Sequence, residues 1–172
     1  MKQFVILGID PGFYVTGYSI LKQDEQGKAF LLDFGYLQMD RKKHLSERVG
    51  EFYNFFSEKI PKYEVTQIAL ETSFLGKNAQ TFLKLGYLRG VLYLLANQNG
   101  LNLSEFSPTE VKMSIAGFGK ASKEQVAMMI MRLFPKLSEV KKVAKDDVTD
   151  ALAISVCGLW QNRQKNSNFN RF

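Results

Sequence analysis

The chain has 172 residues, 45% of them hydrophobic and 23% charged, which fits one ordinary globular domain with enough length for a real core. Its net charge of +6 favours a polyanionic partner such as nucleic acid. The only cysteine, Cys157, excludes an internal disulfide framework and suits a reducing cytoplasm, and no stretch approaches the roughly 20 apolar residues of a membrane span.

The first third of the chain predicts an antiparallel meander followed by a helix. The apolar run QFVILGID (3–10) ends at a carboxylate and then Pro-Gly, which indicates a buried strand and a turn. TGYSILKQ (16–23) and AFLLDFGYLQM (29–39) predict two more strands joined by a polar turn. Residues 44–60 carry apolar side chains at helical spacing, and we expect this helix to end before Pro61.

The remaining elements alternate between strands and helices. We expect strands at 65–71 and 101–107, a long apolar helix at 78–100, two helices at 108–117 and 122–134, and a last helix at 146–160. Cys157 lies within this last apolar helix, where it is expected to be a small core residue. We expect residues 1–160 to form a single domain and the polar, basic segment 161–172 to be disordered.

This order of elements predicts an α/β fold with a five-stranded mixed sheet and helices on both faces. Two predicted strands end on carboxylates, Asp10 and Glu71. If the first and fourth strands are parallel neighbours, these two acids meet at one edge of the sheet, where active sites of open sheets lie. The acidic head of the last helix could complete the cluster.

A group of carboxylates with no cation among them is unstable, so such a group is expected either to bind protons or to share metal ions. Mg²⁺ or Mn²⁺ suits an all-oxygen set, and two such ions about 3.5–4 Å apart can hydrolyse a phosphodiester. His44 is the only histidine, which excludes a histidine-rich zinc site. The chain also lacks a G-x-x-x-x-G-K-[ST] phosphate loop.

Each acid also has a purely structural interpretation. Asp10 before Pro-Gly could be a turn residue, Glu71 could pair with a lysine, and Asp146 or Asp147 could cap the last helix. Helix geometry puts Asp147 and Asp150 (i, i+3) on one face. It allows Asp146 and Asp150 (i, i+4) equally well, so geometry leaves the choice open.

Four stretches together resemble the successive motifs of the RuvC family of Holliday-junction resolvases. They are GIDPGFYVTGY, ALETSFLGKNAQTFLKLGYLRG, SPTEVKMSIAGFGKASKEQVAMMI and DDVTDALAIS, in the family's order over roughly residues 4–158. The resemblance implies a ribonuclease-H-like fold and a homodimer. It also implies a Mg²⁺-dependent endonuclease that resolves four-way DNA junctions by paired symmetric nicks in recombination and repair.

The resemblance also assigns residues. The family's four catalytic, metal-binding acids match Asp10, Glu71, Asp147 and Asp150, which would hold two Mg²⁺ ions with Mn²⁺ as a substitute, whereas Asp146 has no match. The expected DNA contacts are Phe74, Lys112 and Lys123 by their match to the family, and Lys120 and Lys77 by proximity. Branch-migration helicase proteins of the RuvA and RuvB type are expected partners.

Two further features concern the long helix and the first turn. Gly86 and Gly90 could form the dimer face or could simply admit this chain's own sheet, and Arg89 between them could buttress the active site. The family often has small or polar residues where this chain has Phe13 and Tyr14, which predicts altered contacts with the junction or the loop.

Three other functions share some of these sequence features. A non-cleaving junction-binding protein is disfavoured because all four acids are present. A ribonuclease-H-like nuclease acting on RNA or on another branched substrate stays open. A sugar-kinase or actin-like ATPase shares a turn similar to GIDPG, but 172 residues cannot supply its two large lobes.

Overall fold

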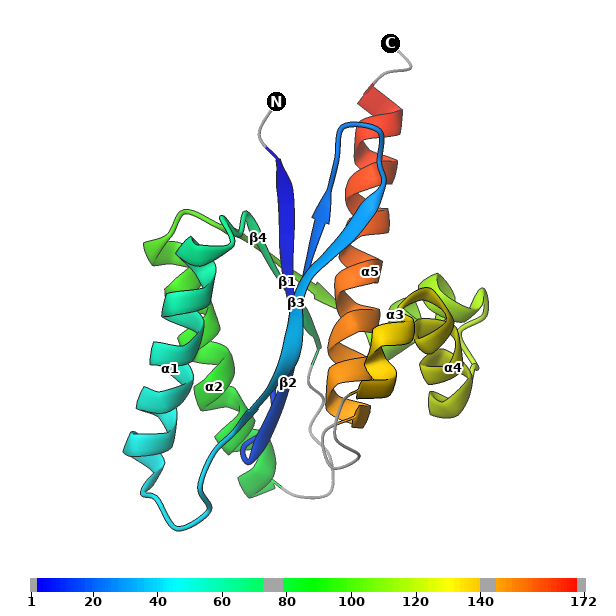
Figure 1. Cartoon of the computed structure of the whole chain (residues 1–172). Helices are drawn as coiled ribbons and strands as arrows, with labels where there is room; N and C mark the ends of the chain where they lie inside the picture. Colours follow the sequence, from blue (N-terminus) through cyan, green and yellow to red (C-terminus); the bar gives the residue numbers. More distant parts are fainter. Residues whose placement is uncertain (1–2, 73–78, 140–144, 170–172) are drawn as a thin grey trace.

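A single twisted sheet organises the protein, whose computed structural model describes residues 3–72, 79–139 and 145–169 (Figure 1). Its five strands lie in the order β3-β2-β1-β4-β5. Their bounds are β1 Phe4–Asp10, β2 Val15–Gln23, β3 Ala29–Gln38, β4 Gln67–Glu71 and β5 Asn102–Phe106. β1, β2 and β3 are antiparallel, whereas β4 pairs in parallel with β1 and with β5, which confirms the expected mixed sheet.

Helices cover both faces of this sheet (Figure 1). One face carries α1 (Leu45–Lys62) and α2 (Ala79–Gln98). The other face carries α5 (Lys145–Phe169), against which α3 (Pro108–Ala116) and α4 (Lys123–Leu133) pack, followed by the short 3₁₀ helix η1 (Pro135–Glu139). Among the described residues, no helix is long and apolar enough to cross a lipid bilayer.

Two hydrophobic cores result, because side chains alternate along each strand. Leu7 and Ile9 of β1 point toward α1 and α2, where they join Phe52 and Phe56. Ile6 points to the opposite face and packs in the second core with α5. Cys157 is buried in that second core, as its apolar surroundings predicted.

The helix α5 lies unusually close to the sheet because glycines face it. A Cβ atom at Gly8 would lie 2.1 Å from the Ser155 side-chain oxygen, and one at Gly17 would lie 2.0 Å from the Asp147 carbonyl oxygen. The Ser19 hydroxyl, on β2 between them, donates to the carbonyl of Ala151 at 3.0 Å. The backbone of α5 therefore packs directly on the glycines of the sheet. This contact fixes the distance of α5 from the sheet and its register along the strands.

Most element boundaries differ from the sequence-based expectations by one or two residues, and the largest difference is at the end of α5. The helix α1 passes through Pro61 and ends at Lys62, because a proline in the last turn sacrifices one hydrogen bond and the chain still closes with Tyr63 donating to the Lys59 carbonyl at 3.1 Å. The helix α5 starts at Lys145, one residue before the expected start. It continues to Phe169, through most of the segment 161–172.

Candidate active site

Two of the four predicted acids meet at the edge formed by neighbouring strand ends. Asp10 is the last residue of β1 and Glu71 is the last residue of β4. The two strands are parallel and pair Ile9 with Leu70, so the next position on each strand carries the carboxylate. This arrangement confirms the expectation that the first and fourth strands are neighbours.

The head of α5 brings in the other two acids. Gly17 on β2 pairs with Asp10 on β1. The backbone of Asp147 packs directly against Gly17, in the space that a side chain would fill. Asp147 and Asp150 are half-buried, whereas Asp146 is exposed on the first turn of α5. The helical register that the sequence left open therefore separates Asp146 from the other two by its exposure.

The electrostatics show that the four carboxylates are close enough to interact. Burial, and then the charges of Asp150, Asp147 and Glu71, raise the pKa of Asp10 to about 7. Burial is also the largest cause that raises the pKa of Glu71, Asp147 and Asp150. We call these four residues the acidic cluster; crowding and partial dehydration together disfavour its fully ionised form.

Two lysines stand beside the acidic cluster. The Lys123 ammonium lies 2.7 Å from an Asp150 carboxylate oxygen. Lys123 is the first residue of α4, whose start is fixed by the reciprocal cap of Ser122 and Gln125. The Lys112 charge lowers the pKa of Glu71, against the net rise. A hollow of about 200 Å³ is lined by Glu71, Lys112, Lys123 and Asp150 together with Pro108, Val111, Val126 and Ala153.

The other expected DNA contacts are less well placed by the structure. Lys120 is exposed in the loop that precedes α4. Phe74 and Lys77 fall in 73–78, outside the described residues. The assignment of Phe74 thus rests on the resemblance alone, and that of Lys77 on its proximity to the family motif in the sequence.

Arg89 buttresses the site from α2, as the sequence suggested. Its guanidinium donates to the backbone carbonyl of Glu71 at 2.7 Å and forms an ion pair with Glu105. Glu105 was not anticipated, because a carboxylate in the short strand β5 has no signature of its own. The contact holds the end of β4 in place through its backbone, which leaves the Glu71 carboxylate free for chemistry.

The turn between β1 and β2 is held by a second pair of contacts. The Thr16 hydroxyl donates to the Gly12 carbonyl at 2.8 Å and accepts from the Gly12 amide at 3.2 Å. Because Gly12 follows Asp10 by two residues, Thr16 limits the freedom of the chain at the end of β1. This role was also missed in the sequence, where a lone threonine in a strand carries no signal.

The donor set fits a divalent metal by its chemistry. The four acids offer only carboxylate oxygens, which Mg²⁺ and Mn²⁺ prefer. As the side chains stand in the described part of the chain, no three His, Cys, Asp or Glu residues converge tightly enough to ligate one ion. The Lys123 ammonium meanwhile supplies a positive charge to Asp150. Metal binding would therefore require the carboxylates to turn inward and Lys123 to release Asp150.

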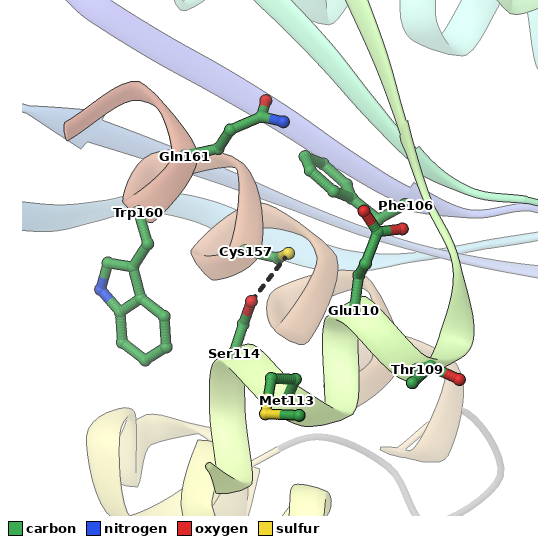
Figure 2. A pocket seen from close by; sticks show the side chains of 8 residues that line it. All are labelled: Phe106, Thr109, Glu110, Met113, Ser114, Cys157, Trp160 and Gln161. Atoms are coloured by element: carbon green, nitrogen blue, oxygen red, sulfur yellow. Dashed lines mark hydrogen bonds between the residues drawn. The ribbon is translucent and has the colours of Figure 1, made fainter. Parts of the chain in front are cut away.

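A larger hollow of about 590 Å³ lies on the opposite face of α3, between α3 and the second half of α5 (Figure 2). Its lining includes Glu110, Met113 and Trp160, and the Ser114 hydroxyl lies 3.2 Å from the Cys157 sulfur within it. None of the four clustered acids lines it. The acids and lysines thus gather at the smaller hollow.

Comparison with known proteins matches this arrangement to one family. The family model described as crossover junction endodeoxyribonuclease RuvC matches residues 6–158. Proteins of that name are similar to this chain: that of Chlorobium phaeobacteroides is 42% identical over 90% of this chain and 81% of its own length. That of Chloroherpeton thalassium is 43% identical over 92% of this chain and 83% of its own.

Solved structures agree with the sequence relatives. The Thermus thermophilus RuvC structure superposes with a TM-score of 0.80 at 27% identity, covering 94% of this chain and 97% of that one. The same protein in complex with a Holliday junction substrate gives a TM-score of 0.82 at 26% identity, with 94% and 96% covered. These likenesses confirm the ribonuclease-H-like fold.

Proposed function

Because the chain belongs to the crossover junction endodeoxyribonuclease RuvC family, we propose that it resolves four-way DNA junctions by paired symmetric nicks in recombination and repair. The observation that carries the proposal is the acidic cluster at one edge of the sheet, where burial and then neighbouring carboxylates raise the pKa of four acids from β1, β4 and α5. Such a cluster needs cations, and phosphodiester hydrolysis is the chemistry that carboxylate-held cations support.

In this proposal Asp10, Glu71, Asp147 and Asp150 hold two Mg²⁺ ions, for which Mn²⁺ can substitute. When bound, the metals supply an activated water and charge stabilisation at the leaving oxygen. Glu71, whose backbone is anchored by Arg89, orients the attacking water. The partly buried position of the acids limits bulk water around the reacting phosphate.

The lysines interact with the negatively charged phosphates of the DNA. Lys123, which pairs with Asp150 in this structure, would have its ammonium free to stabilise the charge on the phosphate if Asp150 held a metal ion instead. Lys112, which lines the same hollow, contributes a second positive charge. Lys120 in the adjoining loop contacts the DNA backbone, and the expected contacts are completed by Phe74, from the family resemblance, and by Lys77, from its proximity in the sequence.

A homodimer formed through α2 fits this function. A Cβ atom at Gly86 or Gly90 would meet nothing within 4 Å, so neither glycine is needed to admit this chain's own sheet. Leu83, Tyr87 and Leu94 are exposed on the same helix, beside an apolar hollow of about 490 Å³ shared with the start of α1. Two copies related by a two-fold axis would match the near two-fold symmetry of a four-way junction.

Partners and location follow from family membership. We expect branch-migration helicase proteins of the RuvA and RuvB type to deliver the junction, and a cytoplasmic location would suit a protein with one buried thiol. Both are predictions for pull-down and localisation measurements.

The deciding experiment is a cleavage assay on a synthetic four-way junction, with the cut sites mapped on all strands. We expect symmetric nicks on two opposed strands in Mg²⁺ or Mn²⁺ and none in EDTA. Linear duplex and an RNA–DNA hybrid serve as competing substrates. Cleavage of the hybrid in preference to the junction would favour a ribonuclease, and junction binding without cleavage would favour a non-cleaving binding protein.

The dimer has its own test. We expect Gly90→Glu to shift the mass measured by light scattering from a dimer to a monomer, because a charged side chain would enter the apolar face. Gly50→Glu is the matched control, since Gly50 in α1 also has open space around it but does not line the hollow. A wild-type protein that is monomeric at the concentrations of the cleavage assay would refute the dimer.

A further inference from the structure

The turn that follows Asp10 carries two aromatic rings and gathers three cations. Phe13 and Tyr14 connect β1 to β2, and their rings meet edge to face at 5.9 Å. Phe13 is buried, whereas the Tyr14 side chain is 39% exposed. A buried anchor therefore carries an exposed ring beside the catalytic strand.

The cations come from α1 and α2. The Arg41 guanidinium, just before α1, lies 4.5 Å from the centre of the Tyr14 ring. The Arg48 guanidinium lies 4.1 Å from the Phe13 ring and 5.3 Å from the Tyr14 ring. The Lys84 ammonium lies 5.8 Å from the Phe13 ring. We call these five residues the cationic–aromatic cluster.

No carboxylate of the described residues pairs with the positive charge of these three cations. Arg48 is 8% exposed, and its Nε and Nη1 atoms are buried without a hydrogen-bond partner. Aromatic faces partly replace the lost hydration of a guanidinium, but they do not cancel its charge.

The cluster lies close to the chemistry. Tyr14 follows Asp10 by four residues, a reach of at most about 14 Å of chain. The turn, the start of α1, the start of α2 and the head of α5 all lie at the same end of the molecule, the lower end in Figure 1. The exposed ring of Tyr14 therefore lies on the side of the molecule from which a DNA strand would reach the acidic cluster.

We propose that the cationic–aromatic cluster binds a backbone phosphate of the DNA strand that enters the active site, within about four nucleotides of the scissile phosphate, given one phosphate per roughly 3.4 Å of strand. The proposal rests on the proposed junction-cleaving function and adds a subsite to it. The sequence indicated that Phe13 and Tyr14 differ from the residues common in the family. The structure places the side chains of two arginines and a lysine against these two rings.

The exposed and buried residues of the cationic–aromatic cluster have different roles in this proposal. Arg41 and Tyr14 are exposed, so they make the contact through the guanidinium and the hydroxyl. Arg48 is buried and supports both rings from beneath, while adding positive potential. Lys84 extends that potential from α2.

The test measures binding of a fluorescent four-way junction by anisotropy in EDTA, over a series of salt concentrations. We expect Arg41→Ala to weaken binding several-fold and to reduce the slope of log affinity against log salt by about 1, as loss of one phosphate contact does. Lys62→Ala is the matched control, because Lys62 also lies near a tyrosine ring, 5.2 Å from that of Tyr63, at the other end of α1. We expect it to bind like wild type.

A second measurement locates the phosphate. Single methylphosphonates, which remove one backbone charge, are placed at successive positions on either side of the cut site. We expect one position to weaken binding by the wild type and to have no effect on Arg41→Ala. If every position affects both proteins alike, or if Arg41→Ala binds with the wild-type affinity and slope, the subsite is refuted.

The controls separate this inference from the proposed function. A wild-type protein that neither binds nor cuts the junction would refute the proposed function, and the subsite with it. A wild type that binds and cuts, beside an Arg41→Ala variant that behaves identically, would refute the subsite alone. An unchanged thermal midpoint shows that any loss in Arg41→Ala is not a loss of folding, as expected for an exposed side chain.

Discussion

The acidic cluster and the cationic–aromatic cluster both crowd like charges at the same end of the sheet, but they relieve the crowding in different ways. Carboxylates can bind protons or cations, and the pKa of Asp10 accordingly rises to about 7. Guanidinium groups cannot lose their proton at physiological pH. Arg41 and Arg48 instead lie against aromatic rings and keep their full charge. The acidic cluster can thus lose negative charge to protons or cations, whereas the cationic–aromatic cluster keeps positive charge that an anion can meet.

The largest expected effect is the loss of nicking activity when an acid of the acidic cluster is replaced. Asp10→Asn should lower the rate of junction nicking on the order of 1000-fold, because a neutral amide no longer helps to hold the cations that do the chemistry. Junction binding should stay within a factor of about two, since lost negative charge does not weaken attraction to DNA. Single-turnover cleavage and anisotropy measure the two quantities. Normal cleavage by Asp10→Asn in Mg²⁺ would end the proposed mechanism.

A smaller effect tests which acids of the helix head belong to the cluster. Asp147→Ala should slow nicking by at least about 100-fold, as expected for loss of a metal-binding carboxylate rather than of a supporting contact. Asp146→Ala should change the rate by less than about twofold, because Asp146 is exposed and contributes to the start of α5. The two variants are adjacent and chemically identical. The opposite result would move the catalytic register by one residue.

The third prediction concerns stability and pH. The raised pKa of Asp10 means that the folded state holds a proton that the unfolded state releases above about pH 4. The stability contributed by this proton is complete below pH 4 and is lost as the pH rises through about 7. In EDTA at pH 8, Asp10→Asn should therefore raise the free energy of unfolding by about 4 kcal/mol relative to wild type, since each unit of the pKa rise corresponds to about 1.4 kcal/mol.

Urea unfolding at two pH values checks this prediction. At pH 4 the difference between Asp10→Asn and wild type should vanish, because the wild-type carboxyl is then protonated in the folded state. Asp146→Asn is the control and should show no comparable gain at pH 8, because Asp146 is exposed. The same stability difference between Asp10→Asn and wild type at pH 4 and pH 8 would mean that burial and the neighbouring carboxylates do not raise the pKa of Asp10.

The smallest effect concerns the cationic half. Arg48→Met keeps the apolar stem and removes the charge, and we expect the free energy of unfolding to change by less than about 1 kcal/mol, since lost ring contacts and relieved burial oppose each other. Arg48→Ala should cost about 2 kcal/mol more, because the stem then leaves a gap under Phe13. Equal losses in both variants, measured by urea unfolding, would show that the charge rather than the stem holds the turn.

The sequence predicted the fold well because its signals were local. The apolar runs VILGI and QIAL predict buried strands. The carboxylate that follows each run indicates the edge of the sheet at which the two strands end side by side. The passage of α1 through Pro61 was missed because proline restricts the residue before it more reliably than it ends a last turn. The early start of α5 at Lys145 was missed because lysine carries no capping signal.

The site was predictable in its acids and much less so in its supports. The spacing of Asp147 and Asp150 is visible in one helix, but their approach to Asp10 depends on Gly17, whose missing side chain makes room for a backbone far along the chain. The pairing of Lys123 with Asp150 and the stacking of Arg48 on Phe13 are likewise tertiary contacts. Such contacts join residues that no local pattern connects.

The dependence of the acidic cluster on α5 has a consequence for synthesis on the ribosome. Asp10 and Glu71 are made early, but Asp147 and Asp150 arrive only with the last helix, which also fills one of the two cores. A nascent chain that lacks α5 has half of the acids and an uncovered sheet face. Under the proposed catalytic role of these acids, a chain assembled in this order gains its cutting ability only when α5 has packed on the sheet.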